Sequence, residues 1–241
     1  MKVIRFDSLE STNKYCEALD LAEEEDFTCY WALAQTAGIG QRGNHWEAAP
    51  GQNLTFSLVF HPTFLPADRQ FKLTEALSLA LLDILKEIRV SKNIKVKWPN
   101  DIYVAGKKIC GTLVSTRLVG NSIASAVCGI GLNVNQCNFP DGVHNPTSLA
   151  MLTDKQYELE PLLQQLLACI EKRYNELKSG FDPEPEYLAH MLNLGSRAHY
   201  IYNEEGISAT ITGVDPHGRL LLTVDDGRHL SCGMKEISFL I

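Results

Sequence analysis

The stretch AGIGQRGNHW, residues Ala37–Trp46, decides between two kinds of fold. It contains the pattern Gly-x-Gly-x-x-Gly, formed by Gly38, Gly40 and Gly43. In a dinucleotide-binding unit this pattern lies between a strand and a helix. The preceding FTCYWALAQT predicts a strand, but Pro50-Gly51 predicts a turn and Leu54–Phe60 a second strand. No helix of useful length fits between them. We therefore predict strand, glycine-rich loop, strand, and reject the dinucleotide-binding fold.

Hydrophobic patterns outside this loop predict a mixture of strands and helices. Strands are expected at 3–6, in NIKVKWPND, in a hairpin that turns at Ala105-Gly106, and in the apolar run SIASAVCGIGLNVN, which is typical of a central strand. Helices are expected from Ser11 or Thr12 to about Glu25, within 68–88, within 158–178, and in PEPEYLAHML.

The pattern changes near residue 193. From there to residue 241 short alternating strands are separated by turn residues at Gly206, Pro216-His217-Gly218 and Asp226-Gly227. This predicts a small antiparallel barrel without helices. We therefore expect an α+β protein with two domains, 1–192 and 193–241.

Composition limits the class of protein. The net charge of −7 gives no overall attraction to nucleic acid or to an anionic membrane. The N-terminus lacks the apolar core of a signal peptide, and no run approaches the roughly 20 apolar residues of a membrane span. Seven scattered cysteines without a C-x-x-C pair are typical of reduced thiols. We expect a cytoplasmic protein with no nucleic-acid or membrane partner.

Three polar, glycine-rich stretches are candidates for chemistry. In Gln35–Trp46 the glycines let backbone N–H groups approach an anion or a flat ligand, and Arg42 adds a positive charge, although a tight connection between strands is an equal alternative. In KVKWPNDIYVAGKKICG, Lys95 and Lys97 share a face of their strand and Lys108 enters the apolar part of the hairpin. Such lysines suit phosphate or a developing negative charge, whereas a solvated basic hairpin is the plainer explanation.

The third stretch is GIGLNVN. Gly129 and Gly131 would weaken a central strand unless a ligand or another backbone approaches closely, and a β-bulge is the alternative. Elsewhere, no pair of histidines has metal-ligand spacing. Ser57, Ser115 and Ser148 lack the G-x-S-x-G context of a serine hydrolase.

Taken in order, these stretches resemble the biotin–protein ligases. The resemblance rests on ESTN, QTAGIGQRGNHW, GQNLTFSL, VKWPNDIYVAGKKICGTLV, GIGLNVN and the tail GVDPHGRLLL…GMKEISF, and it covers nearly the whole chain. KWPND followed by Gly-Lys-Lys-Ile-x-Gly is its most specific part. The resemblance implies a mixed β-sheet flanked by helices, of the class II synthetase-like kind, followed by an SH3-like barrel.

The resemblance also implies an activity. Such an enzyme joins biotin and ATP, with Mg²⁺, into biotinyl-5′-AMP and transfers biotin to a lysine of a biotin carboxyl carrier domain, without a tightly bound cofactor. Biotin would contact Ser11, Thr12, Asn13, Gln35, Gly38, Ile39, Gly40, Gln41, Lys108, Gly111, Gly129 and Gly131. ATP would contact Arg42, Trp46, Lys97, Asn100, Asp101 and Asn133. Lys108 and Arg42 would be catalytic, metal ligands are not identified, and a homodimer is left open.

The sequence departs from the family in two respects. Ile39, Gln41 and Asn44 stand where arginines are usual in the loop, so only Arg42 remains to hold the adenylate phosphate. The sequence begins directly with the first catalytic strand, so we expect no N-terminal DNA-binding domain and no repressor activity. A lipoate or octanoate ligase and a non-enzymatic biotin-sensing module remain as alternatives.

Overall fold

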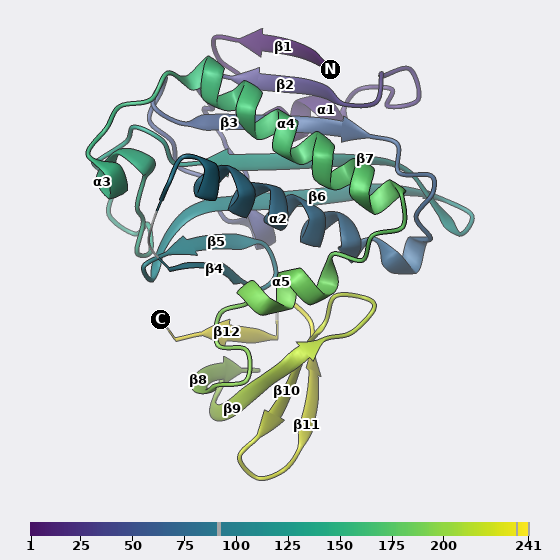
Figure 1. The fold of residues 1–241 in the computed structure, drawn as a ribbon, viewed down its shortest axis with the longest axis vertical. Coiled ribbons are helices and arrows are strands. Elements are labelled where there is room, and N and C mark those ends of the chain that lie inside the picture. Colours follow the sequence, from purple (N-terminus) through teal and green to yellow (C-terminus); the bar gives the residue numbers. More distant parts are fainter. Residues whose placement is uncertain (91–92, 235, 241) are drawn as a thin grey trace.

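A seven-stranded sheet forms the centre of the larger part of the molecule (Figure 1). The computed structural model describes residues 1–90, 93–234 and 236–240. The strands lie in the order β1-β2-β3-β7-β6-β5-β4. They are β1 Lys2–Phe6, β2 Thr28–Ala32, β3 Leu54–Phe60, β4 Ile94–Lys97, β5 Asp101–Val104, β6 Lys107–Val119 and β7 Ser122–Leu132. Because β1 and β2 are parallel and the other neighbours antiparallel, the predicted mixed sheet is confirmed.

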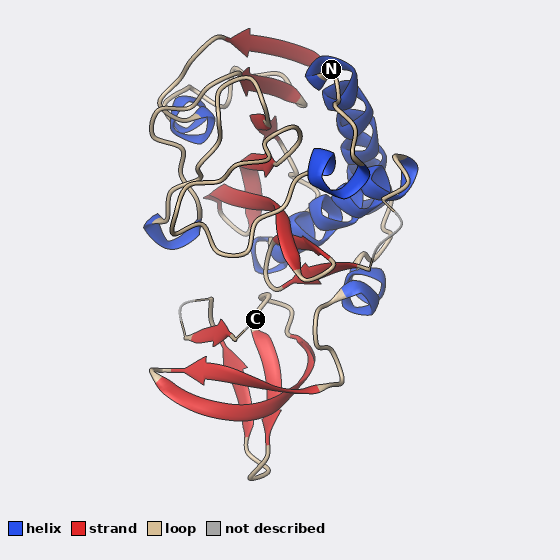
Figure 2. Ribbon diagram, turned by 90° about the vertical axis from the view of Figure 1, so that its left-hand side faces the viewer, coloured by secondary structure: helices blue, strands red, loops and turns tan. Residues whose placement is uncertain are grey.

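Helices cover both faces of this sheet. They are α1 Thr12–Glu17, α2 Phe71–Glu87, α3 Leu149–Thr153, α4 Leu159–Lys178 and α5 Glu184–His190, with single 3₁₀ turns at Gln41–Gly43 and Ala67–Arg69. Helices α2 and α4 pack side by side across one face, and α1 lies against β3 and β7 on the other (Figures 1 and 2). Fourteen of the 17 residues of α2 are buried, because the helix lies between the sheet, α4 and α5.

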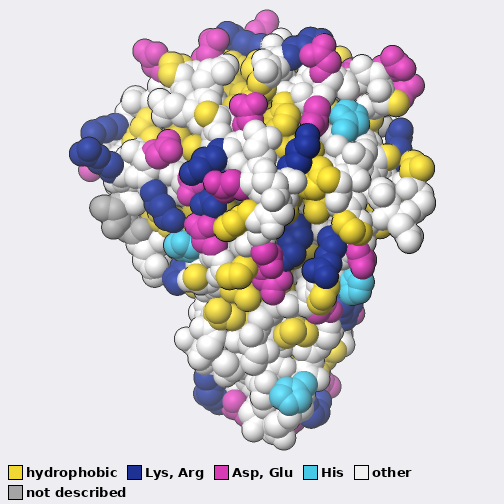
Figure 3. Space-filling model, turned by 45° about the vertical axis from the view of Figure 1, so that its right-hand side comes forward, with side chains coloured by type: hydrophobic (Ala, Val, Ile, Leu, Met, Phe, Trp, Pro, Cys, Tyr) yellow, Lys and Arg dark blue, Asp and Glu magenta, His cyan; other side chains and the backbone are white. Residues whose placement is uncertain are grey.

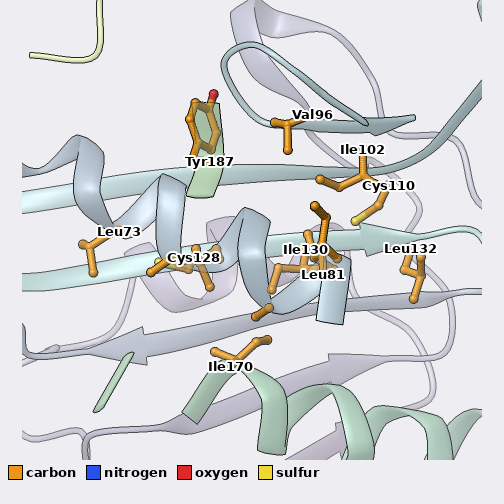
Figure 4. Close-up of a cluster of buried hydrophobic side chains, with 14 of the residues drawn as sticks. Leu73, Leu81, Val96, Ile102, Cys110, Cys128, Ile130, Leu132, Ile170 and Tyr187 are labelled. Carbon is orange, nitrogen blue, oxygen red and sulfur yellow. The ribbon is translucent and has the colours of Figure 1, made fainter. Parts of the chain in front are cut away.

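The main core lies between the sheet and α2 and α4, and strand alternation determines which side chains enter it. On β7, Cys128, Ile130 and Leu132 point into this core with Leu81 and Ile170 of the helices (Figure 4). The intervening positions face the other way, where Val127 belongs to a smaller cluster beneath α1. Gly129 and Gly131 lie on the same face of β7 as Val127, because alternate residues of a strand share a face. The central strand therefore presents apolar side chains to the core and bare backbone to the opposite face.

Several predicted elements are confirmed. The strand at 54–60 and the hairpin turn are found as expected, with φ of 50° at Ala105 and 77° at Gly106. The first helix is shorter than predicted: it ends at Glu17, because the Asp20 carboxylate accepts a hydrogen bond from the Ala22 N–H and supports a local turn. Helix α3 was not predicted, since five residues show no measurable periodicity.

A second, antiparallel sheet follows from Arg197. Its strands are β8 Arg197–Tyr202, β9 Glu205–Val214, β10 Leu220–Val224, β11 His229–Cys232 and β12 Ile237–Phe239, in the order β11-β10-β9-β8-β12. This places β11 and β12 at opposite edges, and in the described residues they do not pair. The sheet is thus open, and the prediction of a closed barrel is not confirmed. With only three residues, β12 pairs with β8 alone.

The two sheets are packed against each other near β4 and β5. The indole Nε1 of Trp98 donates to the carbonyl of Gly218 at 3.0 Å, and the ring of Phe71 lies against the same glycine. The boundary between residues 192 and 193 stays a prediction.

Charged side chains of both signs are interspersed over the face shown in Figure 3. Across the described ranges, no helix combines the length and apolar character needed to cross a membrane.

Candidate active site

A pocket of about 240 Å³ opens on the sheet face opposite α2 and α4. Its walls come from the start of α1, the loop 37–46, the Trp98–Asp101 turn, and strands β6, β7 and β12. Segments from residue 11 to residue 239 thus meet at one site.

One end of the pocket is polar and buried. The Thr12 N–H donates to Gln35 Oε1 at 2.8 Å, and the Ser57 hydroxyl lies 2.8 Å from Thr12 Oγ1 and 2.6 Å from Asn13 Oδ1. Ser11 precedes them as the cap of α1. The Asn13 amide nitrogen is buried and has no hydrogen-bond partner within the described structure. A buried donor without a partner is costly, so this end of the pocket fits a ligand that carries a hydrogen-bond acceptor.

Three glycines form the floor of the pocket, and neighbouring side chains require them. A Cβ on Gly129 would lie 2.0 Å from Asn13 Oδ1, and one on Gly131 would lie 2.2 Å from Trp46 Cε2. Gly111, paired with Gly131 across β6 and β7, also lies under the Trp46 ring. The pairing of β7 with β3 and β6 has no register shift at these positions, so the alternative of a β-bulge is wrong.

A lysine and an aspartate form an ion pair beside this floor. Lys108 Nζ lies 2.7 Å from Asp101 Oδ1, and its side chain is 29% exposed, so it is half-buried. In the β5–β6 pairing, Tyr103 lies opposite Lys108 and Ile102 lies opposite Cys110, so β6 carries one extra residue between these pairs. This extra residue brings Lys108 over Gly111. A bulge re-aims a side chain in this way. The result is a positive charge held at the pocket wall and balanced by one carboxylate.

The second predicted lysine lies between aromatic rings. Lys97 Nζ is 5.7 Å from the centre of the Tyr103 ring and 5.4 Å from that of Phe239 in β12. Burial, with a smaller contribution from Asp101, raises the pKa of Tyr103, which therefore stays neutral. Lys97 lines the pocket, whereas Lys95 is not among the residues of its wall.

The glycine-rich loop folds back on itself. The Gly40 N–H donates to the Asn44 carbonyl at 2.7 Å, and the Trp46 N–H donates to the Gly38 carbonyl at 3.0 Å. This brings Trp46 onto the glycine floor, where its ring lies 5.7 Å from Lys108 Nζ. The side chain of Arg42 lies outside the described part of the structure.

The structure brings most of the predicted site residues together. Those that line the pocket are Ser11, Thr12, Asn13, Gln35, Ile39, Gly40, Gln41, Trp46, Lys97, Asn100, Asp101, Lys108, Gly111, Gly129 and Gly131. Gly38 and Asn133 do not line it. A Cβ on Gly38 would lie 2.5 Å from the Trp46 carbonyl oxygen, so this glycine serves the closure of the loop. The Asn133 amide nitrogen donates to the Thr147 carbonyl at 2.9 Å, and its Oδ1 is buried without a partner among the described residues. The individual roles of all these residues stay predictions.

Several further residues line the pocket but are not among the site residues predicted from the sequence. They are Asn44, His45, Phe56, Trp98, Pro99, Thr112, Leu113, Ile130, Ile237, Ser238 and Phe239. The tail motif GMKEISF was the available signal for the last three. Within the described ranges, no group of three His, Cys, Asp or Glu side chains could hold a metal ion.

The chain is similar to known ligases along nearly its whole length. The model of the biotin/lipoate A/B protein ligase family matches residues 5–133. The bifunctional ligase/repressor BirA of Bacillus subtilis is 30% identical over 93% of this chain and 70% of its own. The biotin–[acetyl-CoA-carboxylase] ligase of Paracoccus denitrificans is 29% identical over 92% of this chain and 94% of its own.

Solved structures agree with this. A biotin protein ligase from Aquifex aeolicus, solved in complex with biotin and ATP, superimposes with a TM-score of 0.81 at 25% identity, covering 98% of this chain and 97% of that one. The chain therefore belongs to the biotin/lipoate A/B protein ligase family.

Proposed function

We propose that this chain is an ATP-dependent biotin–protein ligase. The observation that carries the proposal is that one pocket combines a buried polar end at Asn13 with the Lys108–Asp101 ion pair over a glycine floor. Biotin has a ureido group at one end and a carboxylate at the other. A pocket with an unpartnered donor at one end and a cation at the other matches both.

The proposed chemistry has two steps. In the first, a biotin carboxylate oxygen attacks the α-phosphorus of ATP, the bond to the β-phosphate oxygen breaks, and pyrophosphate leaves. Two anions must approach each other, and Lys108 reduces their repulsion where negative charge accumulates. In the second, the amine of an acceptor lysine attacks the acyl carbon of biotinyl-AMP, AMP leaves, and the amine loses a proton.

Magnesium is proposed to enter with the nucleotide. Mg²⁺ in such sites is bound by one or two carboxylates plus substrate phosphates and does not need a cage of protein ligands. The described residues provide no such cage, and Asp101, the carboxylate of the pocket wall, is already paired with Lys108. We therefore treat ATP-Mg as the substrate and assign no step to a protein-bound metal.

Biotin is favoured over lipoate by the polar end of the pocket. The dithiolane ring of lipoate accepts only weak hydrogen bonds, and would leave the Asn13 amide nitrogen unpaired in a buried place. A site built for hydrogen bonds discriminates strongly against an analogue that lacks them. The Paracoccus denitrificans relative, described as a biotin–[acetyl-CoA-carboxylase] ligase, adds support.

The proposed partner is the biotin carboxyl carrier domain of a carboxylase, as the description of the Paracoccus relative suggests. Three points remain predictions: the cytoplasmic location, the absence of nucleic-acid binding and the division at residue 192.

The proposal is tested by incubating the protein with biotin, ATP-Mg and a biotin-carrier domain. One lysine of the carrier should become biotinylated. Adding lipoate in excess should not reduce ATP-dependent pyrophosphate release. A folded protein that labels nothing would refute the ligase, and one that binds biotin without forming AMP would favour a sensing module.

Lys108→Ala should lower the rate of adenylate formation by at least about 10²-fold and weaken biotin binding far less, because its charge matters most in the transition state. The neighbouring Lys107 is exposed and is not part of the pocket wall, so Lys107→Ala is the matched control. Equal losses of binding and rate in Lys108→Ala would mean that the lysine is only a ligand contact.

A further inference from the structure

The Trp98–Asp101 turn carries part of the pocket wall but is supported from outside the pocket. Asn100 and Asp101 line the site, and Asp101 holds Lys108 at 2.7 Å. The backbone of the turn is fixed to β6, where the Thr112 N–H donates to the Asn100 carbonyl at 3.2 Å. The carbonyl of Pro99 instead has its partner on α5.

That carbonyl accepts a hydrogen bond from Tyr187 of α5. The distance from Tyr187 Oη to the Pro99 oxygen is 2.9 Å, and the tyrosine is fully buried. Its ring packs edge-on against Phe71 of α2, with centroids 5.8 Å apart. Burial, with a smaller contribution from Glu75, holds the pKa of the hydroxyl well above its usual value, so the group stays protonated and donates.

Tyr187 is not part of the pocket wall and lies outside residues 5–133, the part of the chain that the family model matches. Tyr187 is therefore a residue outside both the motifs and the pocket wall that contacts a residue belonging to both, Pro99. The one polar atom of its side chain, Oη, bonds to the turn that carries Asp101, the partner of Lys108.

We infer that Tyr187 is a positioning residue for adenylate formation, holding the Trp98–Asp101 turn so that Asp101 keeps Lys108 at the pocket wall. The inference rests on the proposed function. Without the hydroxyl, the Pro99 carbonyl loses its buried donor, and the turn is held less firmly on this side. Small misplacements of catalytic groups reduce rate more than binding, because alignment matters most in the transition state.

The test is Tyr187→Phe, which removes one oxygen and keeps the ring. We expect the rate constant for biotinyl-AMP formation to fall about tenfold, the effect of losing one hydrogen bond, with an unchanged Kd for biotin. Tyr174→Phe is the matched control, because Tyr174 is also buried but its hydroxyl has no partner in the described part of the chain. The control should keep the wild-type rate. The thermal unfolding midpoints of both variants are measured first, and the rates are then compared at a temperature well below either midpoint.

A double-mutant cycle separates positioning from a general loss of stability. If Tyr187 acts through Asp101, the rate losses of Tyr187→Phe and Asp101→Asn should be less than multiplicative in the combined variant. Fully multiplicative losses, or a Tyr187→Phe variant with the wild-type rate, would overturn the inference while leaving the proposed function intact. A wild-type protein that forms no biotinyl-AMP would overturn both.

Discussion

Replacing Glu75 by glutamine should change how the stability of this protein depends on pH. Glu75 lies on α2 with its side chain 1% exposed. Lys72 Nζ is 3.1 Å from its Oε2 but donates its hydrogen bonds to Asp182 at 2.7 Å and Glu184 at 2.8 Å. Burial raises the pKa of Glu75 to about 7, against the opposing attraction of Lys72.

The sign and size of the effect follow from this pKa. In the unfolded chain the carboxyl titrates near 4.5. Between the two values the folded state holds a proton that the unfolded state has released, so stability is fully present below pH 4.5 and is lost as pH rises through about 7. One pH unit corresponds to about 1.36 kcal/mol. The whole interval is therefore worth roughly 3 kcal/mol, most of it between about pH 5 and pH 8.

Urea unfolding of the wild-type protein and Glu75→Gln at pH 5 and pH 8 measures the effect. The free energy of unfolding of the variant, relative to the wild type, should rise by roughly 2–3 kcal/mol from the lower to the higher pH. Glu171→Gln, at an exposed position of α4, is the control and should give the same difference at both pH values. A relative stability of Glu75→Gln that does not change with pH would show that the carboxyl is not held protonated by burial.

Three further results are expected. Gly131→Ala should displace the Trp46 indole, because the new Cβ would lie 2.2 Å from a ring carbon. The Kd for biotinyl-AMP should rise at least about tenfold. Gly206→Ala is the control and should leave this Kd unchanged, because nothing lies within 4 Å of its Cβ position. A variant with arginine at Ile39 and Gln41 should release preformed biotinyl-AMP more slowly, because each charge-assisted hydrogen bond contributes roughly 1.5–3 kcal/mol; an unchanged dissociation rate would mean that arginines are not what the loop lacks. A thiol reagent should titrate one cysteine in the folded protein, the exposed Cys137, and seven after unfolding; more than one rapid thiol in the folded state would contradict the burial of the other six.

The sequence predicts those parts of the fold whose signals are local. The strand at 54–60 depends on its apolar sequence, and the turn at Ala105-Gly106 depends on a glycine that accepts positive φ. The end of α1 could not be predicted, because the turn at Asp20 competes with a pattern that looks helical to Glu25. The open second sheet could not be predicted either, since closure depends on whether distant edge strands meet.

The same difference between local signals and long-range contacts holds for the candidate site. Gly129 and Gly131 could be singled out because glycine is unfavourable in a central strand, but only the structure shows that Asn13 and Trp46 occupy the space they leave. Asn133 follows the same strand and is predicted to contact the nucleotide; the sequence does not reveal that its amide nitrogen donates to the Thr147 carbonyl, and its role stays a prediction. Contacts between segments far apart in sequence decide such assignments.

The glycine floor has a consequence for engineering this site toward bulkier ligands. At Gly111, Gly129 and Gly131 there is no side chain left to remove, so no substitution can deepen the pocket there. Room for a larger ligand must come from other parts of the wall, and in the loop 37–46 Ile39 offers an aliphatic side chain that can be shortened. Libraries that vary the loop and hold the floor constant would therefore retain more active members than libraries that vary both.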